Sequence, residues 1–106
     1  MNFKFKSSIL ITFIALFLCG SAFCQNNKKF AIVLDAGHGG KDPGNSYHGF
    51  REKDIALKTT LKVGEILEKE KDIKIIYTRT TDTFIELVNR PKVANKANAN
   101  LFVSIH

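Results

Sequence analysis

The chain has 106 residues and carries 16 Lys and Arg against 10 Asp and Glu, a formal charge of +6. Its 44% hydrophobic and 25% charged residues are those of an ordinary globular protein. The lysines are spread from Lys28 to Lys96 without a basic block or interleaved aromatic residues, so the sequence excludes the charge footprint of a nucleic-acid-binding protein.

The first residues have the layout of a secretory signal peptide. Lys4 and Lys6 precede an uncharged apolar run at 9–17, and small residues follow at 20–22. We therefore expect residues 1–24 to be a signal peptide and the protein to be exported, to the periplasm or to the cell wall and beyond.

Cleavage after Cys24 fits the rule of small residues at the cut, and cleavage after Ala22 is an alternative. An uncleaved anchor or a lipid on Cys24 are further alternatives, although Phe23 is bulkier than a lipobox usually accepts. After cleavage we expect no stable membrane insertion, no disulfide, and a short linker at 25–29.

The first predicted strand is the continuous apolar, β-branched run from Phe30 to Asp35, which is typical of a strand covered on both faces. Five glycines and a proline follow between Ala36 and Arg51, so this stretch is predicted to be a long, shaped loop.

A helix is predicted between Glu52 and Glu70, because apolar residues recur there on one helical face and lysines on the other. Apolar runs at 73–78 and 101–106 predict two more strands. With right-handed crossovers, this β-α-β-α-β order predicts an α/β fold with an open, mostly parallel sheet.

The segment before the third strand predicts a second helix. Thr83 and Glu86 have the spacing of a capping box, with Asp82 as an alternative cap. Pro91 lies inside this segment, so we expect a kink or a break into two short helices. The residues expected to face the core are Phe84, Leu87 and Ala94.

The third strand is uncapped at the end of the chain. After cleavage about 82 residues remain, and a chain of that size buries only about 60–65% of its unfolded surface. We therefore expect the sheet to be truncated after its third strand and further strands and helices to follow.

Three potential metal ligands fall at the carboxyl edge of the predicted sheet, where ligands bind in parallel α/β folds. His38 follows the first strand, Glu52 opens the first helix, and His106 ends the third strand. Two imidazoles and a carboxylate suit catalytic Zn²⁺, which keeps a fourth position for water.

Five sequence blocks, in order, resemble the zinc-dependent N-acetylmuramoyl-L-alanine amidases, which hydrolyse peptidoglycan in the cell wall. The blocks are Asp35–Gly44 (DAGHGGKDPG), Glu52–Leu57 (EKDIAL), Thr78–Asp82 (TRTTD), Arg90 with Ala94 and Asn95, and Val103–His106 (VSIH). The resemblance runs from about Ala31 to His106, so it covers nearly all of the chain after the signal peptide.

The resemblance implies that His38, Glu52 and His106 bind one Zn²⁺ and that the substrate is the amide between N-acetylmuramic acid and L-alanine. It also implies a general-base Glu beyond His106, so no catalytic base is expected within this chain. Residues 30–106 are then the N-terminal part of the catalytic domain, inactive alone. The resemblance leaves an activator protein open as a further partner.

Other residues of the blocks are expected to support the site. Asp35 either orients His38 or caps backbone amides of the loop, and Arg79 and Arg90 are expected to make structural ion pairs. His48 lies between two predicted ligands, but the family pattern has no ligand there.

Two other functions remain open at this point. The first is a homologue that binds peptidoglycan without cleaving it. The second is a zinc amidohydrolase or peptidase with another cell-surface substrate.

Overall fold

The structure is a computed structural model that describes residues 28–106, so the predicted signal peptide and most of the predicted linker lie outside the described residues. The long elements are β1 (Phe30–Ala36), α2 (Glu52–Leu67), β4 (Ile73–Tyr77), α3 (Arg90–Lys96) and β5 (Leu101–Ile105). Short elements are β2 (Ser46–Tyr47), β3 (Phe50–Arg51) and the 3-10 helix η2 (Leu87–Asn89).

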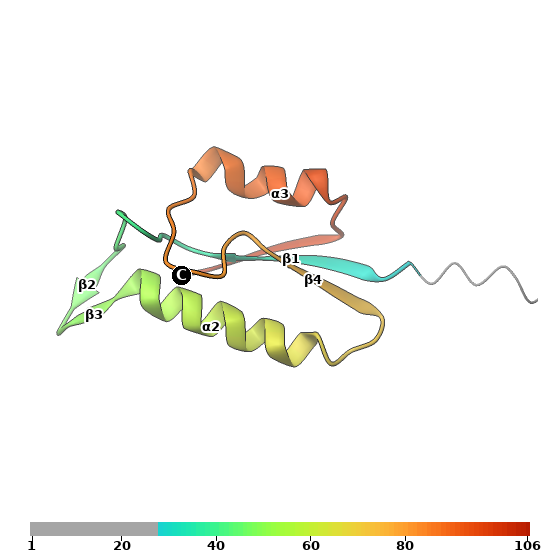
Figure 1. Ribbon diagram of the computed structural model, residues 1–106, viewed down its shortest axis with the longest axis horizontal. Coiled ribbons are helices and arrows are strands. Elements are labelled where there is room, and N and C mark those ends of the chain that lie inside the picture. The colour runs from blue at the N-terminus through green and yellow to red at the C-terminus, as the bar shows by residue number, and fades with distance from the viewer. Residues whose placement is uncertain (1–27) are drawn as a thin grey trace, which may run out of the picture.

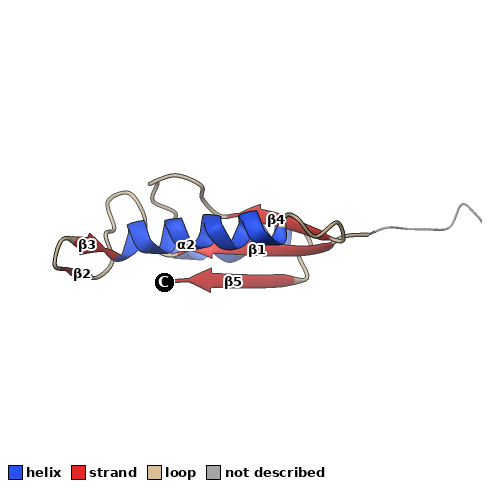
Figure 2. Cartoon of the chain, turned by 90° about the horizontal axis from the view of Figure 1, so that it is seen from below, coloured by secondary structure: helices blue, strands red, loops and turns tan. Residues whose placement is uncertain are grey.

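The central sheet has the strand order β4-β1-β5, and both pairings are parallel. Helix α2 covers one face of the sheet and α3 the other (Figure 1, Figure 2). The predicted α/β fold with a parallel sheet is therefore confirmed. None of the helices in residues 28–106 is long and apolar enough to cross a membrane.

Strand β1 lies in the middle of the sheet and forms the core. Its residues from Ala31 to Ala36 are all buried, and Val33 is 0% exposed. Leu34 pairs with Tyr77 on one side and Val103 on the other, so β1 has no free edge. This double coverage is the physical reason for its continuous apolar sequence.

Helix α2 packs on the sheet through small side chains. Ala56, Thr60 and Gly64 are buried and lie four residues apart, on the face that the apolar pattern predicted. A Cβ at Gly64 would overlap the Tyr77 phenol, so the helix approaches β4 as closely as a glycine allows. The helix ends at Leu67, slightly before the predicted end at Glu70.

The predicted capping box does not form. No side chain caps η2, the chain from Thr83 to Glu86 is irregular, and Leu87 is 80% exposed rather than in the core. Asp82 does not cap a helix either, because its carboxylate accepts hydrogen bonds from the Gly40 amide and the Lys53 ammonium. Long-range contacts have overridden the local signal.

The predicted break into two short helices is confirmed, because η2 and α3 replace one continuous helix. The predicted interior position of Pro91 is wrong, since Pro91 lies in the first turn of α3. A proline is well placed there because the first turn does not use its missing N–H.

The contact between Gly64 and Tyr77 can be tested by Gly64→Ala in the complete gene product. Helix propensity alone predicts a gain of about 0.5–1 kcal/mol, but the overlap with Tyr77 should turn this into a loss of about 1–3 kcal/mol. Denaturant unfolding measures the difference. The loss should shrink in a Tyr77→Leu background, and an unchanged loss there would mean that Tyr77 is not its cause.

Candidate metal centre

The carboxyl edge of the sheet brings the three predicted ligands together. His38 lies two residues beyond β1, Glu52 is the first residue of α2, and His106 directly follows β5. One donor atom from each of the three lies within 4.8 Å of the other two. His106 lies 68 positions from His38 and 54 from Glu52 in the sequence, and it reaches their site because β1 and β5 run parallel.

The distances between the donor atoms suit a tetrahedral metal ion. His38 Nε2 lies 2.9 Å from Glu52 Oε1, and His106 Nδ1 lies 3.3 Å from both of these atoms. Zinc bonds of about 2.0–2.1 Å place neighbouring tetrahedral ligands about 3.3 Å apart. The two imidazoles meet edge to face, with their ring centroids 5.1 Å apart and an angle of 88° between the ring planes.

Asp42 orients the imidazole of His38. Its Oδ2 lies 2.9 Å from His38 Nδ1, which leaves Nε2 directed at Glu52. The hydrogen bond with Asp42 raises the pKa of His38, against the effect of burial. The same bond holds the pKa of Asp42 below its usual value. Asp42 is itself fixed by two backbone hydrogen bonds with Gly39.

Glu52 is held in place by the end of the glycine-rich loop. The backbone N–H of Asn45 donates to Oε2 at 2.9 Å, which lowers the pKa of Glu52 and leaves Oε1 for the two imidazoles. A Cβ at Gly44 would lie 2.6 Å from the ring of His38 and 2.8 Å from Glu52 Oε2. Only glycine leaves room for both ligands there, and its φ of +65° also favours glycine.

His106 is the most exposed of the three residues, with 54% of its side chain accessible. A Cβ at Gly37 would lie 2.6 Å from its ring, so the backbone after β1 forms one wall of its position. Ser104 Oγ lies 3.3 Å from His106 Nε2.

Asp35 has neither of the roles that the sequence suggested. Its carboxylate accepts hydrogen bonds from Thr78 Oγ1 at 2.6 Å, Ser104 Oγ at 2.6 Å and Arg90 Nη1 at 2.9 Å. Burial acts to raise the pKa of Asp35, but these bonds outweigh it and the net pKa lies below the usual value. Asp35 therefore joins the strand ends, and Asp42 takes the predicted place against His38.

Three buried cations hold the loop after β1 by its carbonyl oxygens, and we call Lys53, Arg79 and Arg90 the carbonyl clamp. They are only 4–6% exposed. Arg79 donates hydrogen bonds to the carbonyl oxygens of Ala36 and Gly37, and Arg90 donates to those of Ala36 and His38. Lys53 donates to the carbonyl oxygen of Gly40, and all five distances are 2.7–3.0 Å. The clamp explains how His38 is kept at a φ of +58°, which non-glycine residues rarely adopt.

The predicted ion pair of Arg90 is confirmed by its contact with Asp35. For Arg79 the prediction is wrong, because within the described chain all its hydrogen bonds go to backbone carbonyls: Ala36, Gly37, Lys53 and Thr81. Burial holds the pKa of Arg79 below its usual value. A planar guanidinium with five donors is suited to this task, since a lysine has only three on one atom.

One histidine of this region, His48, lies apart from the cluster. The roles of Asp42 and Lys53 were missed by sequence reasoning. His48 lies at the tip of the β2–β3 hairpin, where its ring contacts Tyr47, and it is outside the cluster. The role of Asp42 could have been found, because it follows His38 by four residues in the same loop. Nothing local signals that Lys53, a lysine in the first turn of a helix, is buried.

The N-acetylmuramoyl-L-alanine amidase family matches residues 32–106. The endolysin of Bacillus phage SPP1 is 51% identical over 75 residues, which are 71% of this chain and 28% of the endolysin. The N-acetylmuramoyl-L-alanine amidase AmiC of Escherichia coli is 42% identical over 81 residues, 76% of this chain and 19% of AmiC.

Solved structures of N-acetylmuramoyl-L-alanine amidases are also similar to this chain. The N-acetylmuramoyl-L-alanine amidase of Clostridium difficile 630 superposes with a TM-score of 0.70 at 37% identity, over 73% of this chain and 42% of that one. The catalytic domain of the Paenibacillus polymyxa amidase CwlV superposes with a TM-score of 0.69 at 43% identity. The match covers 70% of this chain and 42% of the CwlV chain.

The α/β sheet with its cluster at the carboxyl edge matches the fold of N-acetylmuramoyl-L-alanine amidase structures. The chain belongs to the N-acetylmuramoyl-L-alanine amidase family. It spans less than half of the length of each relative compared above.

The pair of Asp35 and Arg90 predicts a large loss of stability in Asp35→Asn. Removing one partner of a buried ion pair should cost about 3 kcal/mol, because the other charge is left buried. Asp54→Asn is the matched control: it breaks an exposed pair with Arg51 and should cost less than about 1 kcal/mol. Denaturant unfolding of the complete gene product measures both.

The same pair predicts a pH dependence. The lowered pKa of Asp35 adds stability that is present above its unfolded pKa, near 3.8, and is lost as the pH falls through its lower folded pKa. The difference between the wild type and Asp35→Asn should therefore narrow at acid pH. A constant difference down to pH ~2 would show that charge is not the cause.

Proposed function

We propose that this chain is part of a zinc-dependent enzyme that hydrolyses the amide between N-acetylmuramic acid and L-alanine in peptidoglycan. The observation that carries the proposal is the convergence of His38, Glu52 and His106 within 4.8 Å, in a chain of the amidase family. Peptidoglycan is then the substrate and principal partner.

The donor set supports one Zn²⁺ as the cofactor. Two imidazole nitrogens and one carboxylate oxygen at mutual distances of 2.9–3.3 Å leave a fourth tetrahedral position free of protein donors in the described part of the chain. When bound, zinc would polarise the substrate carbonyl and lower the pKa of a coordinated water towards 7.

The residues of the chain contribute orientation and protonation state. Asp42 holds His38 Nδ1, so that Nε2 is available as a donor atom, and the hydrogen bond from the Asn45 amide lowers the pKa of Glu52. The exposed face of His106 gives a bulky polymer access to the cluster. The family resemblance implies a general-base Glu that is not one of the residues described here.

The domain organisation is proposed from the sequence. Residues 1–24 form an export signal, 25–29 a linker and 30–106 the N-terminal part of the catalytic domain. Export fits a substrate outside the cytoplasm. A peptidoglycan-binding homologue without activity and a zinc amidohydrolase with another substrate are the alternatives that the experiments below distinguish.

Hydrolysis is tested by mass spectrometry of purified peptidoglycan digested with the complete gene product. We expect free stem peptides that begin with L-alanine, their loss on chelation and their return with zinc. His38→Ala should abolish release because it removes a ligand, whereas His48→Ala should leave it nearly intact. Intact peptidoglycan with bound protein would favour the binding homologue, and equal losses in both variants would contradict the ligand assignment.

The role of Asp42 is tested by zinc affinity rather than activity. Asp42→Ala should weaken zinc binding about 10- to 100-fold, because carboxylates that orient a metal-binding histidine typically have effects of this size. Competition with a chromophoric chelator measures the affinity. Asp54→Ala, at an exposed position of α2, is the control and should bind zinc as the wild type does.

A further inference from the structure

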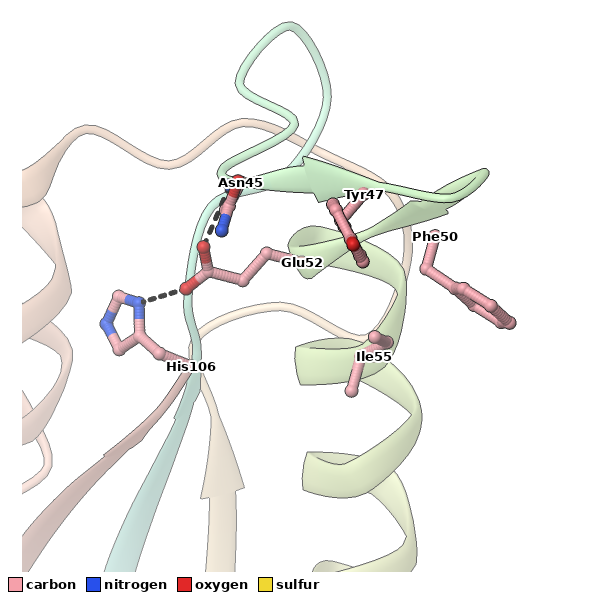
Figure 3. Close-up of a pocket in the computed structure, with 6 residues that line it drawn as sticks. All are labelled: Asn45, Tyr47, Phe50, Glu52, Ile55 and His106. Carbon is pink, nitrogen blue, oxygen red and sulfur yellow. Dashed lines mark hydrogen bonds and ion pairs between the residues drawn. The ribbon is translucent and has the colours of Figure 1, made fainter.

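An open groove adjoins the candidate metal centre. It encloses about 590 Å³ and is lined by Asn45, Tyr47, Phe50, Glu52, Ile55 and His106. Figure 3 shows Glu52 reaching towards His106, with Tyr47, Phe50 and Ile55 on the other side of Glu52. Glu52 and His106 belong both to the lining of the groove and to the candidate metal centre. A molecule in this groove therefore lies directly beside the metal ligands.

The β2–β3 hairpin presents two aromatic side chains to this groove. Tyr47 and Phe50 are direct partners in the antiparallel pairing, so their side chains lie on the same face of the hairpin. They are 73% and 69% exposed, and Ile55 on α2 is 51% exposed beside them. Such a cluster of exposed apolar groups at the edge of a site is typical of a binding surface.

The chemistry of the groove favours an uncharged ligand. Among the described residues that line it, Glu52 is the only acidic side chain and none is Lys or Arg. Apart from a metal ion held by Glu52 and His106, a peptide with free carboxylates would therefore find no Lys or Arg side chain there. A pyranose ring is better matched, because its C–H groups carry partial positive charge and pack on the negative face of an aromatic ring, while its hydroxyl groups stay in water.

A second hollow also has His106 in its wall. It encloses about 330 Å³, and its lining includes His38, Phe84 and Arg90. The amide of the proposed substrate has a glycan on one side and a peptide on the other, so two hollows are needed. Its lining also includes Asp35, Asp42 and Glu86, and the Arg90 guanidinium is paired with Asp35, so charge does not assign this hollow to the acidic peptide. The assignment of the other groove to the glycan rests on its two exposed aromatic rings.

We propose that Tyr47 and Phe50 form a saccharide platform that binds the glycan strand of peptidoglycan next to the metal centre. This inference rests on the proposed amidase function for its choice of glycan. The platform contributes binding and specificity, and it takes no part in bond cleavage.

The platform is tested first by binding, with the metal removed by chelation. The complete gene product is titrated with peptide-free glycan strands and, separately, with free stem peptide. Replacing both aromatics, Tyr47→Ala with Phe50→Ala, should weaken glycan binding about tenfold or more, as aromatic anchors commonly do. Stem-peptide binding should not change.

Two controls separate stacking from general effects. Tyr47→Phe keeps the ring and should retain the wild-type affinity for glycan. Phe30→Ala removes a half-exposed aromatic at the opposite end of β1, 48% accessible, and should have no effect on glycan binding.

Kinetics provide the second readout. The double variant should show a higher KM for long glycan strands and an unchanged kcat. Wild-type glycan affinity in the double variant, loss of peptide binding instead, or no measurable glycan binding by the wild type would each overturn the platform. Glycan binding that depends on the two aromatics, without any amide hydrolysis by the wild type, would support the platform and contradict the proposed enzyme function.

Discussion

One buried ion pair joins the parts of the molecule that must stay aligned. Asp35, at the end of β1, holds Thr78 after β4 and Ser104 in β5, and it pairs with Arg90 of α3. Arg90 in turn holds the carbonyl oxygens of Ala36 and His38. Three strand ends, a helix and the metal-site loop therefore depend on one carboxylate and one guanidinium, and losing either would leave a buried charge without its partner.

The rest of the carbonyl clamp extends this arrangement across the loop. Arg79 and Lys53 bind carbonyl oxygens from Gly37 and Gly40, so the loop path is set by cations beneath it rather than by its own sequence alone. A loop held in this way can keep His38 in a left-handed backbone conformation. Such preorganisation means that little conformational entropy remains to be lost when a metal binds.

Contacts with the same loop also explain why the predicted helix does not form at 83–86. The capping signal at Thr83 is local and weak, worth about 1 kcal/mol. Asp82 instead binds the Gly40 amide and the Lys53 ammonium, and the backbone of Phe84 packs against Gly40. This segment is therefore drawn towards the glycine loop, and the helix starts only at Arg90.

The sequence by itself determined the order of strands and helices along the chain of an α/β fold and the three residues whose donor atoms converge, because strand runs, helical periodicity and ligand blocks are local patterns. Only the tertiary structure decided that Asp42 rather than Asp35 meets His38, and that Lys53 and Arg79 are buried against carbonyls. The contacts of Lys53 and Arg79 reach carbonyl oxygens 13 and 43 residues away, and pairings at such separations leave no periodic trace in the sequence. The contact between Asp42 and His38 spans only four residues, but which acidic side chain meets the imidazole depends on how the loop folds.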